Sequence, residues 1–382
     1  MRRRARVALL VATSCALAHP LVAQPSQHRS FSFYSENDAY DLLGKGSSDS
    51  SYTNGVRIAW DILHFSERLG RWQRRLSLDW LADAVNGHDA VPAARKACAP
   101  REDRTDGRLC GSLGFGLTQT MYTPSDIVVP SLQRRDRPYA GLLLGSVYLT
   151  TLRRRVHSTT ELQVGMLGPW SGSESTQSLA HWTWSPGSAK PRGWHNQLRN
   201  AAQIGLVNSY AFRPKYSELC LAKFGCNGGY GEARVFDVTP RVEGVLGTHM
   251  IRGSAGGIAR LGWRFPDVVG LSRIPVTAAR ASDGGSFDPW FNFFLSYDRR
   301  AVLHNAMITG RSLYRSDRWD DVRQISLTRD VAEIAYGVSA GFARASLVAQ
   351  VVRRSGEYGP SGGWHRFGTL TLMLHTPPFF PD

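Results

Sequence analysis

Beyond residue 23, the sequence has no uninterrupted apolar run of about 18 residues, which is the length of a transmembrane helix. Helical periodicity is also scarce, because few segments place apolar residues three and four positions apart. No repeat recurs along the chain, and no second domain is evident. These absences exclude a helical membrane protein and favour a fold that is built from strands.

Acidic residues are few: 31 Asp and Glu stand against 46 Lys and Arg. Residues 1–23 contain four of the arginines, an apolar run from Val7 to Leu17, and small residues that end at Ala23. This is the pattern of a secretory signal peptide, and we expect cleavage after Ala23. Cleavage lowers the formal net charge from +15 to +11. A basic exported chain indicates anionic partners such as lipid phosphates or lipopolysaccharide, and no nucleic-acid-binding motif is present.

Cysteine is also scarce, with five in the chain. Cys15 lies in the signal segment, where a lipoprotein signal is the alternative, although the preceding Ala-Thr-Ser matches it poorly. The other four permit three disulfide pairings, and an oxidising compartment favours disulfides. We expect Cys98–Cys110 and Cys220–Cys226 to close two loops. A zinc site is the alternative, but no histidine lies at ligand spacing near them.

Alternation of apolar and polar residues with period two is abundant. Leu162, Val164 and Met166 alternate with polar neighbours, as do Leu370 and Leu372, and we expect these five side chains to face lipid. About twelve segments read as strands. They are 29–38, 52–63, 110–122, 138–150, 159–168, 196–212, 232–248, 251–264, 289–302, 331–342, 344–355 and 362–374.

This pattern predicts an all-β fold. Segments of about ten or more residues, joined by alternately short and long connections, are typical of outer-membrane strands. We therefore expect residues 24–382 to form one antiparallel outer-membrane β-barrel of about 12 strands with long extracellular loops. Residues 67–85, within the connection 64–109, read as a helical piece. The alternative is a soluble β-sandwich or barrel whose apolar face points inward.

Clusters of polar residues lie at predicted strand ends. Glu36-Asn37-Asp38 ends the first strand and Tyr52-Thr53-Asn54-Gly55 begins the second, so a hairpin brings them to one rim. Two further pairs of strings follow: "QTMYTP" at 119–124 with "DRPYAG" at 136–141, and "GPWSGSESTQSLAHWTW" at 168–184 with "GWHNQL" at 193–198.

Together these strings resemble the outer-membrane lipid A 3′-O-deacylase family, the LpxR-like proteins. That family shows N-D, then Y-T-x-G, then Y-[ST]-P with D-R, then G-P followed by Q-x-x-x-H. The matching positions here are Asn37-Asp38, Tyr52 to Gly55, Tyr122-Thr123-Pro124 with Asp136-Arg137, Gly168-Pro169, Gln177 and His181. The resemblance implies a twelve-stranded barrel with a calcium-dependent esterase site near its outer rim, and lipid A as the substrate.

The resemblance also assigns roles to single residues. His181 corresponds to the general base and Asp38 to a calcium ligand, while Asn37 and Thr53 correspond to polar groups that complete the site. The chemistry is consistent, because histidine titrates near neutral pH and can activate water for ester hydrolysis. Calcium takes oxygen ligands, so Asp38 with loop oxygens around Ser50 would hold it.

Each assignment has an alternative. Taken alone, Asn37 and Asp38 read as turn formers, and His181 reads as a surface histidine in a loop. His195 is a rival base. A Ser/His/Asp triad is less attractive than direct attack by water, because no G-x-S-x-G string appears. Asn37 and Asp38 are also consecutive, so on a regular strand they face opposite sides.

The sequence departs from the family pattern in the segment after Tyr122-Thr123-Pro124. Some members carry a lysine there, near the site, whereas this chain has Val128 and Val129. Arg134 or Arg135 is the possible substitute.

The sequence thus predicts a calcium-dependent ester hydrolase in the outer membrane of a Gram-negative bacterium. It would remove the 3′-linked acyl (acyloxyacyl) group from lipid A of lipopolysaccharide. We expect a monomer whose partners are lipopolysaccharide and outer-membrane lipid. One alternative is a non-catalytic barrel, a porin or structural protein with a degenerate site. Another is a soluble β-protein that binds a polyanionic glycan.

Overall fold

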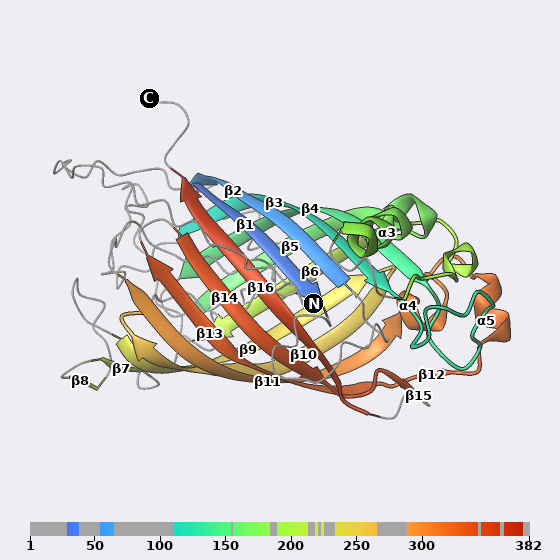
Figure 1. The fold of residues 1–382 in the computed structure, drawn as a ribbon. Helices are drawn as coiled ribbons and strands as arrows, with labels where there is room; N and C mark the ends of the chain where they lie inside the picture. Colours follow the sequence, from blue (N-terminus) through green and yellow to red (C-terminus); the bar gives the residue numbers. More distant parts are fainter. Residues whose placement is uncertain are drawn as a thin grey trace, which may run out of the picture.

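The strands close into an antiparallel β-barrel, which Figure 1 shows from the side. The computed structural model describes residues 29–37, 54–64, 110–153, 156–183, 189–212, 218–220, 223–224, 234–265, 289–342, 345–359 and 363–376. Within these ranges twelve long strands follow one another around the wall, and β1 pairs with β16 to close the barrel. The expected architecture and strand number are therefore confirmed.

The wall strands run between 9 and 16 residues in length. Their bounds are β1 (Arg29–Asn37), β2 (Asn54–His64), β3 (Cys110–Tyr122), β4 (Ala140–Arg153), β5 (Val156–Leu167), β6 (Ala201–Phe212), β9 (Arg234–Gly247), β10 (Met250–Trp263), β11 (Trp290–Asn305), β13 (Asp330–Phe342), β14 (Ala345–Arg354) and β16 (His365–Thr376).

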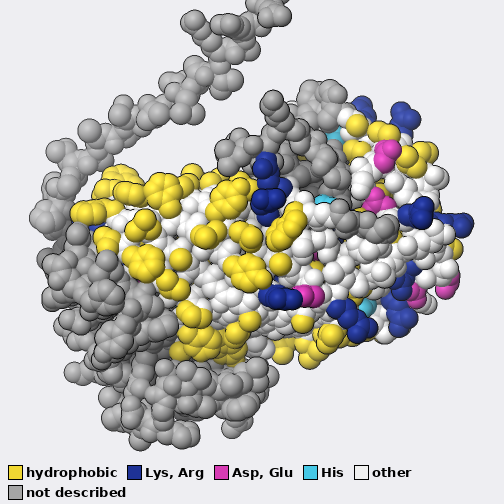
Figure 2. Space-filling model, turned by 90° about the horizontal axis from the view of Figure 1, so that it is seen from below, with side chains coloured by type: hydrophobic (Ala, Val, Ile, Leu, Met, Phe, Trp, Pro, Cys, Tyr) yellow, Lys and Arg dark blue, Asp and Glu magenta, His cyan; other side chains and the backbone are white. Residues whose placement is uncertain are grey.

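The period-two pattern of the sequence becomes the two faces of this wall. In β11, side chains alternate between buried and exposed along almost the whole strand, because successive residues point to opposite sides. Apolar residues occupy the outer side, and Figure 2 shows them spread over the barrel wall. Leu162, Val164, Leu370 and Leu372 are exposed on this outer face, as expected, while Met166 is half-buried.

The inner side of the wall is polar. Arg57 of β2 donates to Glu161 of β5 through both terminal nitrogens, at 3.0 and 3.2 Å, and both residues are buried. Asp237 accepts from Arg260 Nε at 2.8 Å in the same manner. A buried charge is costly unless it is paired, so these ion pairs allow charged side chains to occupy the lumen.

Helices and short strands gather at one end of the barrel (Figure 1), which we call the α3 rim. They are η2 (Pro169–Ser171), α3 (Ser173–Thr183), η3 (Trp194–Asn196), α4 (Ala306–Thr309), α5 (Arg318–Val322), β12 (Ser326–Leu327) and β15 (Tyr358–Gly359). Two further short strands, β7 (Glu218–Cys220) and β8 (Lys223–Phe224), extend the sheet beside β9 at the opposite end.

A buried apolar cluster fastens several of these elements to the barrel. It joins Trp319 of α5 and Met307 of α4 to Leu142 and Leu144 of β4. No helix in the described ranges is long and apolar enough to cross a membrane. β1 begins and β16 ends at the rim opposite α3, where Arg29 pairs with Thr376.

Several expectations fall on other parts of the chain. The signal peptide at 1–23 and the helical piece at 67–85 lie outside the described residues. Cys98 and Cys226 also lie outside them, so the two disulfides stay predictions.

Candidate functional site

A row of paired residues crosses four strands where they reach the α3 rim. Asn37 ends β1 and lies opposite Asn54 of β2. Asn54 lies opposite Met121 of β3, which in turn lies opposite Gly141 of β4. The hairpin expected from the sequence therefore does bring the first two motifs to one rim. Asp38, Ser50 and Thr53 lie outside the described residues, so their positions stay predictions.

This row belongs to the outer side of the wall. In β1 the even-numbered Tyr34 and Glu36 are buried in the lumen, so Asn37 has the opposite parity. In β2 the buried Arg57 points inward, so Asn54 also has outward parity. The same alternation places Met121 outside, since Thr118 and Thr120 of β3 face the lumen. The candidate site is therefore on the barrel wall and not inside it.

The segment that carries His181 folds over this outer wall. Gly168 takes φ 98°, Pro169 begins η2, and Gly172 takes a left-handed conformation before α3 starts. Gln119 Nε2 donates to the Ser171 carbonyl at 2.7 Å, which ties η2 to the outer face of β3. A Cβ at Gly141 would overlap the hydroxyls of Ser171 and Ser173, so glycine is needed for this close approach.

His181 is buried and lies in α3, not in a loop as the sequence suggested. Ser173, Gln177 and His181 are the buried residues of this helix, and they are spaced by four, so they form one stripe toward the protein. The segment was not expected to be helical because this buried stripe is polar and gives no hydrophobic period.

Gln177 links α3 to the third and fourth motifs. Trp194 Nε1 donates to Gln177 Oε1 at 2.7 Å, and both side chains are only 2% exposed. Trp194 packs with Tyr139 and Met121 in one buried cluster, its ring 5.1 Å from that of Tyr139. Gln177 is therefore linked through Trp194 to Met121, which lies opposite Asn54 in the row.

Two polar atoms of this site lack a hydrogen-bond partner among the described residues. They are the buried Oδ1 of Asn54 and the buried Nε2 of Gln177. Buried polar atoms are seldom left unpaired, so this acceptor and this donor are available to a bound ligand. The rival base His195 is exposed, and its Nε2 lies 3.0 Å from Asn196 Nδ2. Burial on the stripe favours His181 over His195.

The D-R part of the third motif is structural. Asp136 accepts hydrogen bonds from the backbone amides of Ser125 and Arg137, each at 2.7 Å. The guanidinium of the buried Arg137 lies over the ring of Tyr122, 4.5 Å from its centroid. These contacts hold the connection between β3 and β4 in place. Val128 in this connection is exposed, and so are Arg134 and Arg135.

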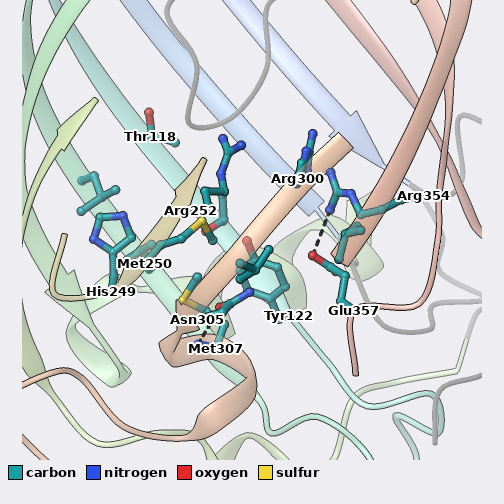
Figure 3. A pocket seen from close by; sticks show the side chains of 15 residues that line it. Thr118, Tyr122, His249, Met250, Arg252, Arg300, Asn305, Met307, Arg354 and Glu357 are labelled. Atoms are coloured by element: carbon teal, nitrogen blue, oxygen red, sulfur yellow. Dashed lines mark hydrogen bonds and ion pairs between the residues drawn. The ribbon is translucent and has the colours of Figure 1, made fainter. Parts of the chain in front are cut away.

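A cavity that was not expected from the sequence lies inside the barrel near the same rim (Figure 3). It contains about 690 Å³ of space, including its opening to solvent. Arg252, Arg300, Arg354 and Glu357 line it, and an ion pair of 3.6 Å joins the last two. Burial alone would raise the pKa of Glu357, but Arg354 and the other arginines outweigh it and lower that pKa.

His249 also lines this cavity, from the turn between β9 and β10. It is 1% exposed, and neither ring nitrogen has a partner within the described ranges. Burial, together with the charges of His304 and Arg252, lowers the pKa of His249 to about 4. This histidine is therefore neutral at pH 7.

The described part of the chain contains no group of three or more His, Cys, Asp or Glu residues placed to hold a metal ion. Asp38 and Ser50 lie outside that part. The unpartnered Asn54 Oδ1 does fit calcium, because carboxamide oxygens are among the ligands that calcium takes.

Comparisons with known proteins agree with the barrel fold. The family model described as "Outer membrane protein LpxR" matches residues 7–376. The structure of LpxR from Salmonella typhimurium is similar in fold, with a TM-score of 0.62 at 16% identity over 90% of this chain and 99% of that chain.

Two other barrels are less similar. The β domain of the Bordetella autotransporter BrkA has a TM-score of 0.39 at 10% identity, over 92% of this chain and 99% of its own. An outer membrane channel from Pseudomonas putida F1 has a TM-score of 0.37 at 10% identity, over 93% and 97%. No curated protein sequence matches the chain.

Proposed function

Because the chain belongs to the LpxR family of outer membrane proteins, we propose that it is a lipid A deacylase, a hydrolase of carboxylic esters. We propose further that it requires calcium and releases the 3′-linked acyl group. The observation that carries the proposal is the buried stripe of α3, with His181 and Gln177, which Trp194 links to Met121 of the Asn37–Asn54–Met121 row on the outer wall.

The position of the site suits a lipid substrate. In barrels with an even number of strands both chain ends lie on one side, which is the periplasmic side in the outer membrane. We therefore place the α3 rim at the outer leaflet, because β1 begins and β16 ends at the opposite rim. A lipid can then reach Asn37 and Asn54 from the bilayer without entering the lumen.

The reaction needs a base and a stabilised oxyanion on the same ester. His181 accepts a proton from water as the water oxygen bonds to the ester carbonyl carbon. When the ester C–O bond breaks, the departing sugar oxygen takes the proton back, which leaves a fatty acid and a free hydroxyl. The Nε2 of Gln177 is a donor without a partner in the described ranges and can hold the substrate near His181.

Asp38 and oxygens around Ser50 would hold calcium, with Asn54 Oδ1 as an oxygen of the right kind nearby. Calcium bound there would polarise the ester carbonyl and stabilise the oxyanion. Asn37 and Thr53 are proposed to complete the polar surroundings of the carbonyl.

Mass spectrometry of lipid A from cells with and without the protein tests the activity directly. His181→Ala should lower turnover by about 10²–10⁴-fold, which is the usual contribution of a general base. Asp38→Ala should abolish activity and its calcium dependence together, and Thr53→Ala should cause a smaller loss. The exposed His195→Ala is the matched control and should keep wild-type turnover.

Deacylation that persists in both His181→Ala and Asp38→Ala would show that the site is wrongly assigned. No fatty acid release by the wild-type protein with calcium present would favour the non-catalytic barrel, and Val128 and Val129 would then be the first positions to change. Steady conductance in planar bilayers would support a porin.

A further inference from the structure

Two connections run side by side along the α3 rim, and their contacts form a seam. Residues 195–203 lead into β6, and residues 312–318 join α4 to α5. Arg318 Nη2 donates to the His195 carbonyl at 3.2 Å, and Arg315 Nη1 donates to the Asn200 carbonyl at 2.9 Å. Tyr314 donates its hydroxyl proton to the Ala202 carbonyl. The two connections therefore run antiparallel to each other.

The seam exposes three arginines that have no carboxylate partner among the described residues. Arg199, Arg315 and Arg318 are exposed, and no described Asp or Glu lies within ion-pair distance of their guanidinium groups. Asp317, which precedes Arg318 in the chain, is buried and accepts from the backbone amides of Arg199 at 2.6 Å and Trp319 at 3.4 Å. The positive charge of this seam is therefore not balanced locally.

Apolar side chains continue from the seam down the outer wall. Leu313 and Tyr314 are 50% and 58% exposed beside Arg315. The Leu313 amide donates to the Thr248 carbonyl at 3.1 Å, so this corner is attached to the turn between β9 and β10. Below it, Ile204, Leu246 and Leu303 expose more than half of their surface on β6, β9 and β11. Figure 2 shows the same change from an apolar wall to basic side chains toward this end of the barrel.

The seam has a rigid support. Trp319 is buried in the core cluster with Met307 and Ile308, and Gly310 takes φ 75° where a Cβ would overlap the Trp319 ring. The arginines thus project from a packed base, which lowers the entropic cost of binding a ligand.

We propose that this seam is a second, non-catalytic binding site for lipopolysaccharide. Guanidinium groups bind phosphate through paired hydrogen bonds, so Arg199, Arg315 and Arg318 take the phosphates of the headgroup. The acyl chains lie along Ile204 and Leu246. The inference rests on the proposed function for its orientation, with the α3 rim at the outer leaflet. The site lies over β6, β9 and β11, whereas α3 contacts β3 and β4.

The test counts lipopolysaccharide molecules on the full-length protein in detergent by native mass spectrometry. The His181→Ala background slows turnover during the measurement. The probe is rough lipopolysaccharide, and the same lipid with its phosphates removed is measured alongside it. We expect two bound molecules. Arg199→Gln/Arg315→Gln/Arg318→Gln should retain one, with affinity at the second site weakened on the order of 100-fold, because each arginine near an anionic lipid surface contributes about fivefold.

The matched control is Arg311→Gln/Arg323→Gln/Arg329→Gln, which removes equal charge from the same rim and should retain two molecules. Heat-modifiable gel migration confirms that both variants are folded. Unchanged binding by the seam variant, or equal binding of the dephosphorylated lipid, would overturn the inference.

Activity separates this site from the proposed catalytic site. With His181 intact, the seam variant should deacylate detergent-dispersed substrate within about twofold of wild type, a difference within the ±0.5 kcal/mol expected of surface substitutions away from a site. Loss of deacylation together with binding would place these arginines in the substrate groove and overturn a separate site. If wild-type protein releases no fatty acid but the seam variant still loses one bound lipid, the proposed function fails and this inference stands.

Discussion

Trp194→Phe tests whether one hydrogen bond positions α3 and therefore His181. The substitution keeps an aromatic ring against Tyr139 and Met121 but removes the donor to Gln177 Oε1 at 2.7 Å. A buried acceptor left without its donor costs about 1–3 kcal/mol. The other polar contacts between this segment and the wall hold its N-terminal part: the Gly168 amide donates to the Gly141 carbonyl at 2.8 Å, Gln119 donates to the Ser171 carbonyl at 2.7 Å, and Ser173 donates to the Thr120 carbonyl at 3.5 Å.

If that cost falls on the packing of α3 against the wall, the fraction of molecules with α3 packed in place drops by about 5- to 150-fold. The kcat/KM for lipid A deacylation should then drop by the same factor. The strand ladder is not involved, so heat-modifiable gel migration should stay normal. Fatty acid release measured by mass spectrometry gives the rate. Trp182→Phe, an exposed position on the same helix, is the matched control and should stay within about twofold of wild type.

A double variant sharpens the test. Replacing both partners of a buried hydrogen bond by apolar groups is nearly neutral for packing, so Trp194→Phe/Gln177→Leu should reseat α3. Recovered activity would mean that Gln177 only positions the helix, whereas a persistent loss would mean that its Nε2 contacts substrate. Wild-type activity in the single Trp194→Phe variant would refute the positioning argument.

Three further predictions concern stability, each measured by gel migration or proteolysis of the folded barrel. Arg57→Met should lower the free energy of unfolding by about 3–5 kcal/mol, because it leaves Glu161 buried without its ion-pair partner. The double variant Arg57→Met/Glu161→Leu should recover most of this loss, and equal melting temperatures of the two variants would contradict a stabilising role of the ion pair. Because burial lowers the pKa of His249 from 6.5 to about 4, the unfolded chain binds this proton first as pH falls. The contribution of His249 to the free energy of unfolding is then full above pH 6.5 and about 3 kcal/mol lower near pH 4. His249→Phe should make stability depend less on pH in this range, and an unchanged pH dependence of stability would contradict the prediction. Gly310→Ala places an alanine in the left-handed region, which costs about 1–2 kcal/mol of conformational energy, and its Cβ overlaps the Trp319 ring. The substitution should speed proteolysis of residues 306–325 while the barrel stays intact, and unchanged cleavage would contradict this prediction.

The sequence by itself determined the wall of the barrel. Period-two alternation is a local property, so each strand could be recognised from its own residues, and the exposed Leu162 and Val164 follow from it. It also determined that Asn37 and Asn54 meet, because a single hairpin joins their strands. The family resemblance pointed to His181, but nothing local showed the helix that carries it, because the buried stripe of α3 is polar.

Only the tertiary structure decided which side of the wall the candidate site occupies. Alternation shows that Glu36 and Asn37 face opposite sides, but closure of β1 against β16 decides which side is the lumen. Likewise, Arg57 and Glu161 are 104 residues apart and meet only because four consecutive strands set their register. The seam of Arg199 and Arg315 arises in the same way, since both segments are irregular and their contact depends on the packed base beneath them. Non-local pairing of this kind has no periodic signature in the sequence, and that is why the folded barrel was needed to find it.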